Sequence, residues 1–102
     1  MEARALRGRE REARMEALLR RAIRERRVIA FRYGGEHREV EPYRLGLQAG
    51  RLRLTGWQSR KGWRSFHADA MEDLALAPRT FDEPREGYAR GDPTMDRILA
   101  EL

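Results

Sequence analysis

The stretch REVEPYRLGLQAGRLRLTGWQSRKGWRSF, residues 38–66, decides the fold, because apolar residues alternate along it in three runs joined by two glycine-bearing turns. In the middle run, Leu52 and Leu54 fall on one side of an extended chain. Arg53 and Trp57 fall on the other side, and this period of two is typical of a half-buried strand. The turns are short enough to reverse the chain directly, so we predict an antiparallel meander.

The sequence before this stretch adds a first strand. Residues 27–33 are rich in β-branched and aromatic side chains and end at Gly34-Gly35, a dipeptide that favours a tight hairpin turn. In the next predicted strand, residues 37–47, the inward side switches at Pro42. Proline cannot donate to a strand ladder, so we place a bulge or sharp bend there, as small barrels require in order to close.

Helical patterns flank the predicted strands. Residues 9–26 carry apolar side chains at helical spacing, which predicts an amphipathic helix that packs on the barrel or, as an alternative, pairs in a dimer. Gly8 should loosen this helix from the arginine-rich residues 1–7. After the connector, Asp92-Pro93 resembles a helix cap, which predicts a short C-terminal helix.

The ordered set Arg-x-Val-x-Pro-Tyr-x-Leu, Leu-x-Leu-x-Gly-Trp and Trp-Arg-x-Phe resembles the bacterial WYL-domain family over about residues 18–81. The resemblance implies a mostly β fold with flanking helices, built on an Sm-like, SH3-type small antiparallel barrel. Two family motifs differ here: Leu52-Arg53-Leu54 replaces the naming triplet, and residues 66–71 lack two arginines that family members often turn towards an anionic ligand.

Length and composition set limits on the function. With 102 residues we expect one domain, 1–102, divided into the helix 9–26, the barrel 27–81 and the connector with its helix 82–102. The chain has no cysteine and no apolar run near the ~20 residues of a membrane helix, so we expect a cytoplasmic protein without membrane association. No nucleophile, carboxylate pair or metal-ligand spacing stands out, so we expect no enzyme, metal or cofactor.

Charge is distributed unevenly along the chain, although the formal net charge is +5. Residues 1–27 carry ten Arg against five Glu, and residues 28–67 carry seven Arg and one Lys against three Glu. Residues 68–102 carry four Arg against nine acids. A basic front and an acidic tail can attract a polyanion, attract each other, or serve solubility alone.

Cations alternate with aromatic rings in the central stretch, the pattern by which proteins bind single-stranded nucleic acid. The alternative is that the rings are core and the arginines are a solvated rim. Arg38 and Arg64 differ from the rest because they share strand parity with the apolar Val40 and Phe66. We therefore predict that these two arginines hold an anion together. The complete predicted ligand-binding set is Arg38, Tyr43, Arg44, Arg53, Trp57, Trp63, Arg64 and His67.

Two functions from different classes follow. The first, implied by the family resemblance, is a regulatory sensor module in transcription control or phage defence that binds single-stranded nucleic acid or a nucleotide-like anion. The second is a protein-interaction module, a homodimer or the subunit of a partner regulatory protein, in which the arginine-rich helix meets an acidic surface.

Overall fold

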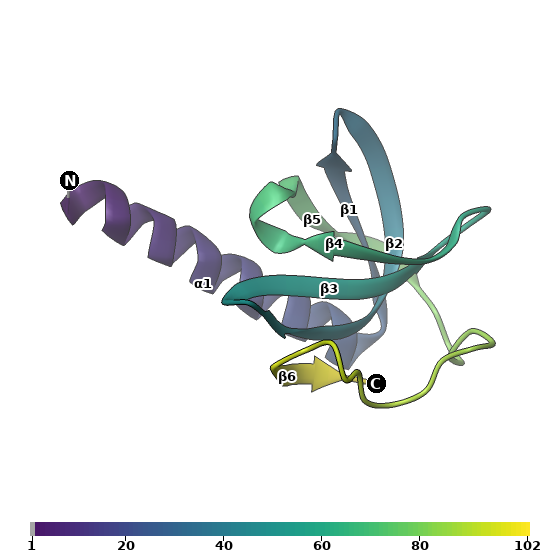
Figure 1. Ribbon diagram of the computed structural model, residues 1–102. Coiled ribbons are helices and arrows are strands. Elements are labelled where there is room, and N and C mark those ends of the chain that lie inside the picture. The colour runs from purple at the N-terminus through teal and green to yellow at the C-terminus, as the bar shows by residue number, and fades with distance from the viewer. Residues whose placement is uncertain (1) are drawn as a thin grey trace.

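The computed structural model describes residues 2–102, with side chains from residue 8 onward. One helix, six strands and one 3₁₀ turn follow each other in the order α1 (Glu2–Glu25), β1 (Arg27–Tyr33), β2 (Glu36–Gln48), β3 (Arg51–Gln58), β4 (Gly62–His67), η1 (Ala68–Ala70), β5 (Glu72–Thr80) and β6 (Arg97–Glu101). Helix α1 packs across the strands with its C-terminal turns, and its N-terminal turns extend past them (Figure 1). The mostly β expectation is confirmed.

The strands form a curled antiparallel sheet in the order β4-β3-β2-β1-β5, with β6 paired to β2. Within the described residues no pairing joins the end strands β4 and β5, so the sheet is not closed into the predicted barrel. Residues 68–70 form a 3₁₀ turn that joins the two end strands, and β5 makes its backbone pairs with β1 alone, so its other edge has no partner strand among the described residues.

Strand β2 is the central element because both halves of the sheet depend on it. Its first half pairs with β1, from Ile29 opposite Val40 to Tyr33 opposite Glu36. Its second half pairs with β3, and the register shifts between Pro42 and Arg44. The predicted bulge at proline is therefore confirmed, and it bends β2 from one half of the sheet into the other.

Helix α1 is longer than predicted, because it runs through Gly8 without a break. A glycine inside a helix costs only about 1 kcal/mol relative to alanine, and the Arg, Glu and Ala residues around it are strong helix formers. The side chains of residues 1–7 lie outside the described part. The helix ends before Arg26, whose backbone is left-handed (φ 52°) and whose N–H bonds to the Ile23 carbonyl at 3.2 Å.

The predicted C-terminal helix is wrong, since residues 97–101 form strand β6. The residues after Asp92 make a single turn, in which the Met95 N–H bonds to the Asp92 carbonyl at 3.1 Å. The chain then pairs with β2, and Leu45 lies opposite Ala100. The open edge of β2 beyond its bend supplies backbone partners that a short isolated helix would lack.

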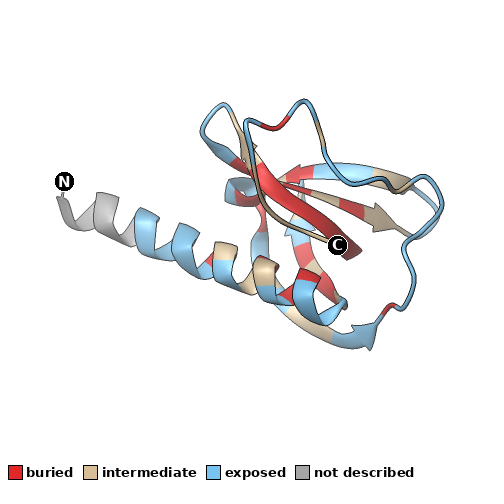
Figure 2. Ribbon diagram, turned by 90° about the horizontal axis from the view of Figure 1, so that it is seen from below, coloured by how far each residue is buried: buried red, intermediate tan, exposed pale blue. Residues whose placement is uncertain are grey.

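Two buried clusters hold the fold together. The larger joins the buried side of α1 to the inner face of the sheet, and it contains Leu19, Phe31 and Leu54, each at most 1% exposed. The smaller surrounds Tyr43 with Val28 and Phe81. Buried residues gather where α1 meets the strands, whereas residues 8–14 of the helix are exposed (Figure 2). The prediction that the apolar stripe of the helix docks on the strands is confirmed.

Candidate anion-binding site

Five of the eight predicted ligand-binding residues share the outer face of β2, β3 and β4. Trp57 lies opposite Trp63 in the β3–β4 register, and Arg53 lies opposite His67. Arg44 lies opposite Thr55, which is on the Arg53 side of β3. Because paired residues project to the same face, one surface carries these cations and rings. We call it the outer face.

The outer face is covered by residues 81–102, which we call the C-terminal segment. Glu101 accepts a hydrogen bond from Arg44 at 3.0 Å, and Asp92 accepts one from Arg53 at 2.8 Å. The two arginine side chains are only 7% and 13% exposed. The acidic tail and the basic front of the chain therefore attract each other here, and these arginines are already neutralised.

The pKa values of the two carboxylates agree with this pairing. The hydrogen bond from the Thr94 hydroxyl lowers the pKa of Asp92, with smaller effects from its backbone N–H and from Arg53. Burial alone would raise the pKa of Glu101, but the Gly91 N–H and Arg44 together lower it. Both groups therefore remain ionised beside their arginines at neutral pH.

The rings of the predicted site are also occupied. Trp63 stacks on Tyr88 with an interplanar angle of 27° and a centroid distance of 6.0 Å, and the Trp57 ring is covered by Arg85 at 3.9 Å. Tyr43 is fully buried in the smaller cluster. Tyr43 was predicted to bind the ligand, but in the structure it is a core residue. A base cannot stack on the ring faces that Tyr88 and Arg85 cover while the C-terminal segment is in place.

His67 is partly buried and is not an exposed cation of the site. Its backbone N–H donates to the Tyr33 hydroxyl at 3.2 Å. Its Nδ1 is buried and has no hydrogen-bond partner among the described residues. The side chain is partly buried on the outer face, opposite Arg53.

Arg38 and Arg64 occupy the inner face, where the sheet is open at one end. Arg38 donates to Gln58 at 3.2 Å, and its guanidinium lies 5.9 Å from the centre of the Phe66 ring. Arg64 lies opposite Gly56, two residues from both Gln58 and Phe66 in the ladder. Strand alternation places Arg64 on the same face of the sheet as Gln58 and Phe66, the two residues that Arg38 contacts. This geometry is consistent with the prediction that Arg38 and Arg64 lie on one side of the sheet.

The two arginines differ in their partners. Arg38 is 17% exposed and pairs with Glu36 at 3.2 Å, while its Nε is buried and has no partner among the described side chains. Lys61 lies 3.9 Å from the same Glu36. Arg64 is exposed and forms no ion pair with any side chain from residue 8 onward. We call Arg38, Lys61 and Arg64 the hairpin-end cations.

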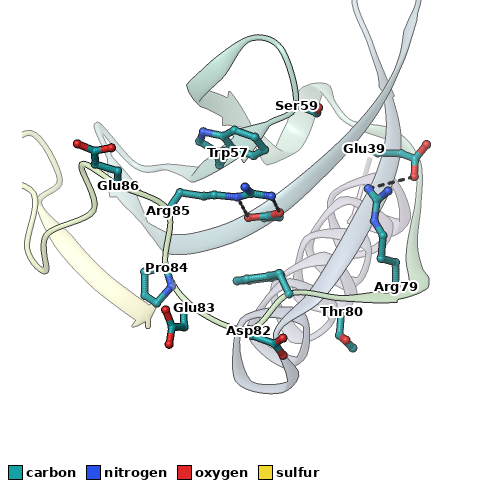
Figure 3. A pocket seen from close by; sticks show the side chains of 12 residues that line it. Glu39, Trp57, Ser59, Arg79, Thr80, Asp82, Glu83, Pro84, Arg85 and Glu86 are labelled. Atoms are coloured by element: carbon teal, nitrogen blue, oxygen red, sulfur yellow. Dashed lines mark hydrogen bonds and ion pairs between the residues drawn. The ribbon is translucent and has the colours of Figure 1, made fainter.

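Two features of this region lie outside the predicted ligand-binding set. Lys61 lies in the turn between β3 and β4, beside the strand ends that this turn connects. An acidic cavity of about 520 Å³ lies on the other side of the same hairpin, between Trp57 and residues 79–86 (Figure 3). The acidic residues 82, 83 and 86 are a visible signal for it in the sequence.

The comparisons with known proteins agree with the fold. The model of the WYL domain matches residues 14–76, more than half of the chain, so the protein belongs to the WYL-domain family. Among solved structures, proteasome accessory factor B/C (PafBC) of Arthrobacter aurescens is similar, with a TM-score of 0.64 and 27% identity. The similarity covers 74% of this chain and 13% of that chain. No curated protein matches the sequence.

Among the described residues, no helix has the length and apolar character needed to cross a membrane. The same residues contain no group of three or more His, Cys, Asp or Glu side chains arranged to hold a metal ion.

Proposed function

We propose that this WYL domain is a regulatory sensor module, not an enzyme, and that its ligand is a single-stranded nucleic acid or a nucleotide-like anion. Membership of the WYL family and the similarity to PafBC support the regulatory role. The single observation that favours an anion is a local excess of positive charge: Arg38 and Lys61 share one carboxylate, Glu36, and Arg64, on the same face of the sheet as Arg38, has no ion pair among the described side chains.

The hairpin-end cations suit phosphate for two reasons. A guanidinium presents several N–H donors in a plane, so Arg64 can bind two oxygens of one phosphate. Arg38 is already largely removed from water, and its buried Nε lacks a partner among the described groups. A cation that is partly desolvated before binding loses less hydration when a phosphate arrives.

This proposal concerns phosphate and not base recognition. The outer face has the rings that bases would need, but Tyr88 and Arg85 lie on them. The outer-face arginines are paired with Asp92 and Glu101. The hairpin-end cations have one carboxylate for three positive charges, so they retain an excess of positive charge.

The experiment compares Arg64→Ala with Arg53→Ala in binding a fluorescently labelled oligothymidine, measured by anisotropy. Removing a hydrogen bond to a charged group costs about 1.5–3 kcal/mol, so Arg64→Ala should weaken binding about tenfold or more. Arg53→Ala, whose partner is Asp92, should change binding little. Equal losses in the two variants, with both folded by circular dichroism, would contradict the assignment.

The protein-interaction alternative has its own support in the acidic cavity on the opposite side of the β3–β4 hairpin.

A further inference from the structure

The acidic cavity has a charge opposite to that of the whole chain. Its walls carry five carboxylates and two guanidinium groups, contributed by Glu39, Glu41, Asp82, Glu83, Glu86, Arg79 and Arg85. The cavity therefore has an excess of three negative charges, whereas the chain has a net charge of +5. Arg79 lies 3.6 Å from Glu39, and Arg85 pairs with Glu41. Within the described part of the chain, Asp82, Glu83 and Glu86 have no ion-pair partner.

One wall of the cavity forms a binding site for a guanidinium group. Glu41 is 8% exposed and binds Arg85 through both oxygens, at 3.1 Å to Nε and 2.8 Å to Nη2. The Trp57 ring lies 3.9 Å from the same guanidinium. The Tyr43 hydroxyl donates to Glu41 at 3.1 Å and so fixes the carboxylate. We call Glu41, Tyr43 and Trp57 the guanidinium clamp. Figure 3 shows the Trp57 ring beside the Arg85 guanidinium.

The clamp selects for arginine over other ligands. Two parallel hydrogen bonds to one carboxylate need a planar fork of donors, which lysine lacks. Stacking on an indole further favours a flat cation. The buried Glu41 and the excess negative charge reject phosphate and carboxylate ligands.

Arg85 is placed so that it can be exchanged. Its side chain is 47% exposed, although the carboxylate of Glu41 beneath it is buried. It belongs to residues 81–90, which contain no helix or strand and are mostly exposed. If another guanidinium enters as Arg85 leaves, Glu41 is never a buried charge without a partner, a state that would cost several kcal/mol.

We propose that the acidic cavity is a docking site for an arginine-bearing segment of a partner protein, whose guanidinium replaces Arg85 in the clamp. Charge complementarity identifies this partner: the clamp fits one guanidinium, and Asp82, Glu83 and Glu86 attract the cations beside it. Arg85 is then an internal competitor. It keeps the clamp filled when no partner is bound.

The experiment uses the full chain and a capped Gly-Arg-Gly peptide, with a Gly-Lys-Gly peptide as the matched ligand control. Binding is measured by NMR titration at low salt. Because Arg85 competes with the peptide, Arg85→Ala should bind the arginine peptide more tightly than the unmodified protein. If Arg85 leaves the clamp free about one-tenth of the time, the gain is roughly tenfold. The lysine peptide should bind several-fold more weakly to the same variant.

A second variant tests the carboxylates without disturbing the clamp. Glu83 and Glu86 are exposed, so Glu83→Gln with Glu86→Gln should fold and should weaken arginine-peptide binding. Glu10→Gln, on the exposed side of α1, removes a comparable charge and should leave binding unchanged. Equal or weaker binding by Arg85→Ala, or no preference for arginine over lysine, would overturn the proposal. Self-association that depends on Glu83 and Glu86 without peptide would assign the cavity to a second copy instead.

Discussion

Truncation of Leu19 in α1 tests whether the helix is part of the fold, because this residue lies at the centre of the contact between helix and sheet. Leu19 is 0% exposed and belongs to the larger core cluster. Replacing a buried leucine with alanine removes its transfer free energy and leaves a cavity, at a cost of about 2–5 kcal/mol. For a domain of this size, 1 kcal/mol shifts the thermal midpoint by roughly 4 °C or more. We therefore expect Leu19→Ala to lower the midpoint by at least about 8 °C.

Two neighbouring arginines provide graded controls in the same helix. Arg20 donates to the Leu99 carbonyl at 2.9 Å and so joins α1 to β6; a hydrogen bond of this kind contributes about 0.5–1.5 kcal/mol. The side chain of Arg24 is 71% exposed, and its removal should change stability by less than about 0.5 kcal/mol. Calorimetric unfolding of the three alanine variants should give the order Leu19, Arg20, Arg24. Equal midpoints for the Leu19 and Arg24 variants would refute the placement of the helix.

Two further predictions concern stability. A Cβ on Gly56 would collide with a Val40 methyl and lie 2.7 Å from the Glu41 carbonyl oxygen, so Gly56→Ala should destabilise by about 1–3 kcal/mol or more. Gly8→Ala meets nothing within 4 Å and should stabilise the protein; the reverse order in denaturant titrations would contradict this packing. Burial raises the pKa of Tyr43 to about 12, from an ordinary value of 10.0, because the neutral phenol is favoured in the folded state. The stability that depends on this phenol should be present below pH 10 and lost as the pH rises towards 12. Tyr43→Phe should flatten the alkaline stability profile, and an unchanged profile would rule out this role.

The strands were predictable because their causes are local. Period-two alternation placed β3, and Gly34-Gly35 placed the β1–β2 hairpin. The bend at Pro42 followed from proline's missing donor. In contrast, β6 looks helical in its own sequence and becomes a strand because the edge of β2 is free. Pairing between distant segments is not visible in a local pattern.

For the candidate site as well, local patterns were predictable and contacts between distant segments were not. Parity correctly placed Arg53 and Trp57 on one face and Arg38 on the other. It could not show that Asp92 and Glu101 would neutralise the outer face, because those residues are far away in the chain. The opposite charges of the two ends of the chain favoured such pairing, but they did not identify the partners. The guanidinium clamp and its occupant Arg85 were missed for the same reason.

The β3–β4 hairpin therefore separates two surfaces of opposite charge. Gln58 contacts Arg38 on the inner side, whereas Trp57 and Ser59 line the acidic cavity on the outer side. Adjacent residues in a strand project to opposite faces, so a single hairpin can present both surfaces. An anionic ligand and an arginine-bearing partner would then bind at separate places on the domain.

The salt dependence of oligothymidine binding tests the proposed anion site most directly. Three cations that each neutralise one phosphate of a single strand predict a slope of about −2 in a plot of log affinity against log salt concentration, at roughly 0.7 per contact. Arg64→Ala should reduce the magnitude of this slope by about 0.7. A flat salt response in the unmodified protein, or tighter binding of duplex than of single strand, would contradict the proposal that the hairpin-end cations hold a single-stranded anion.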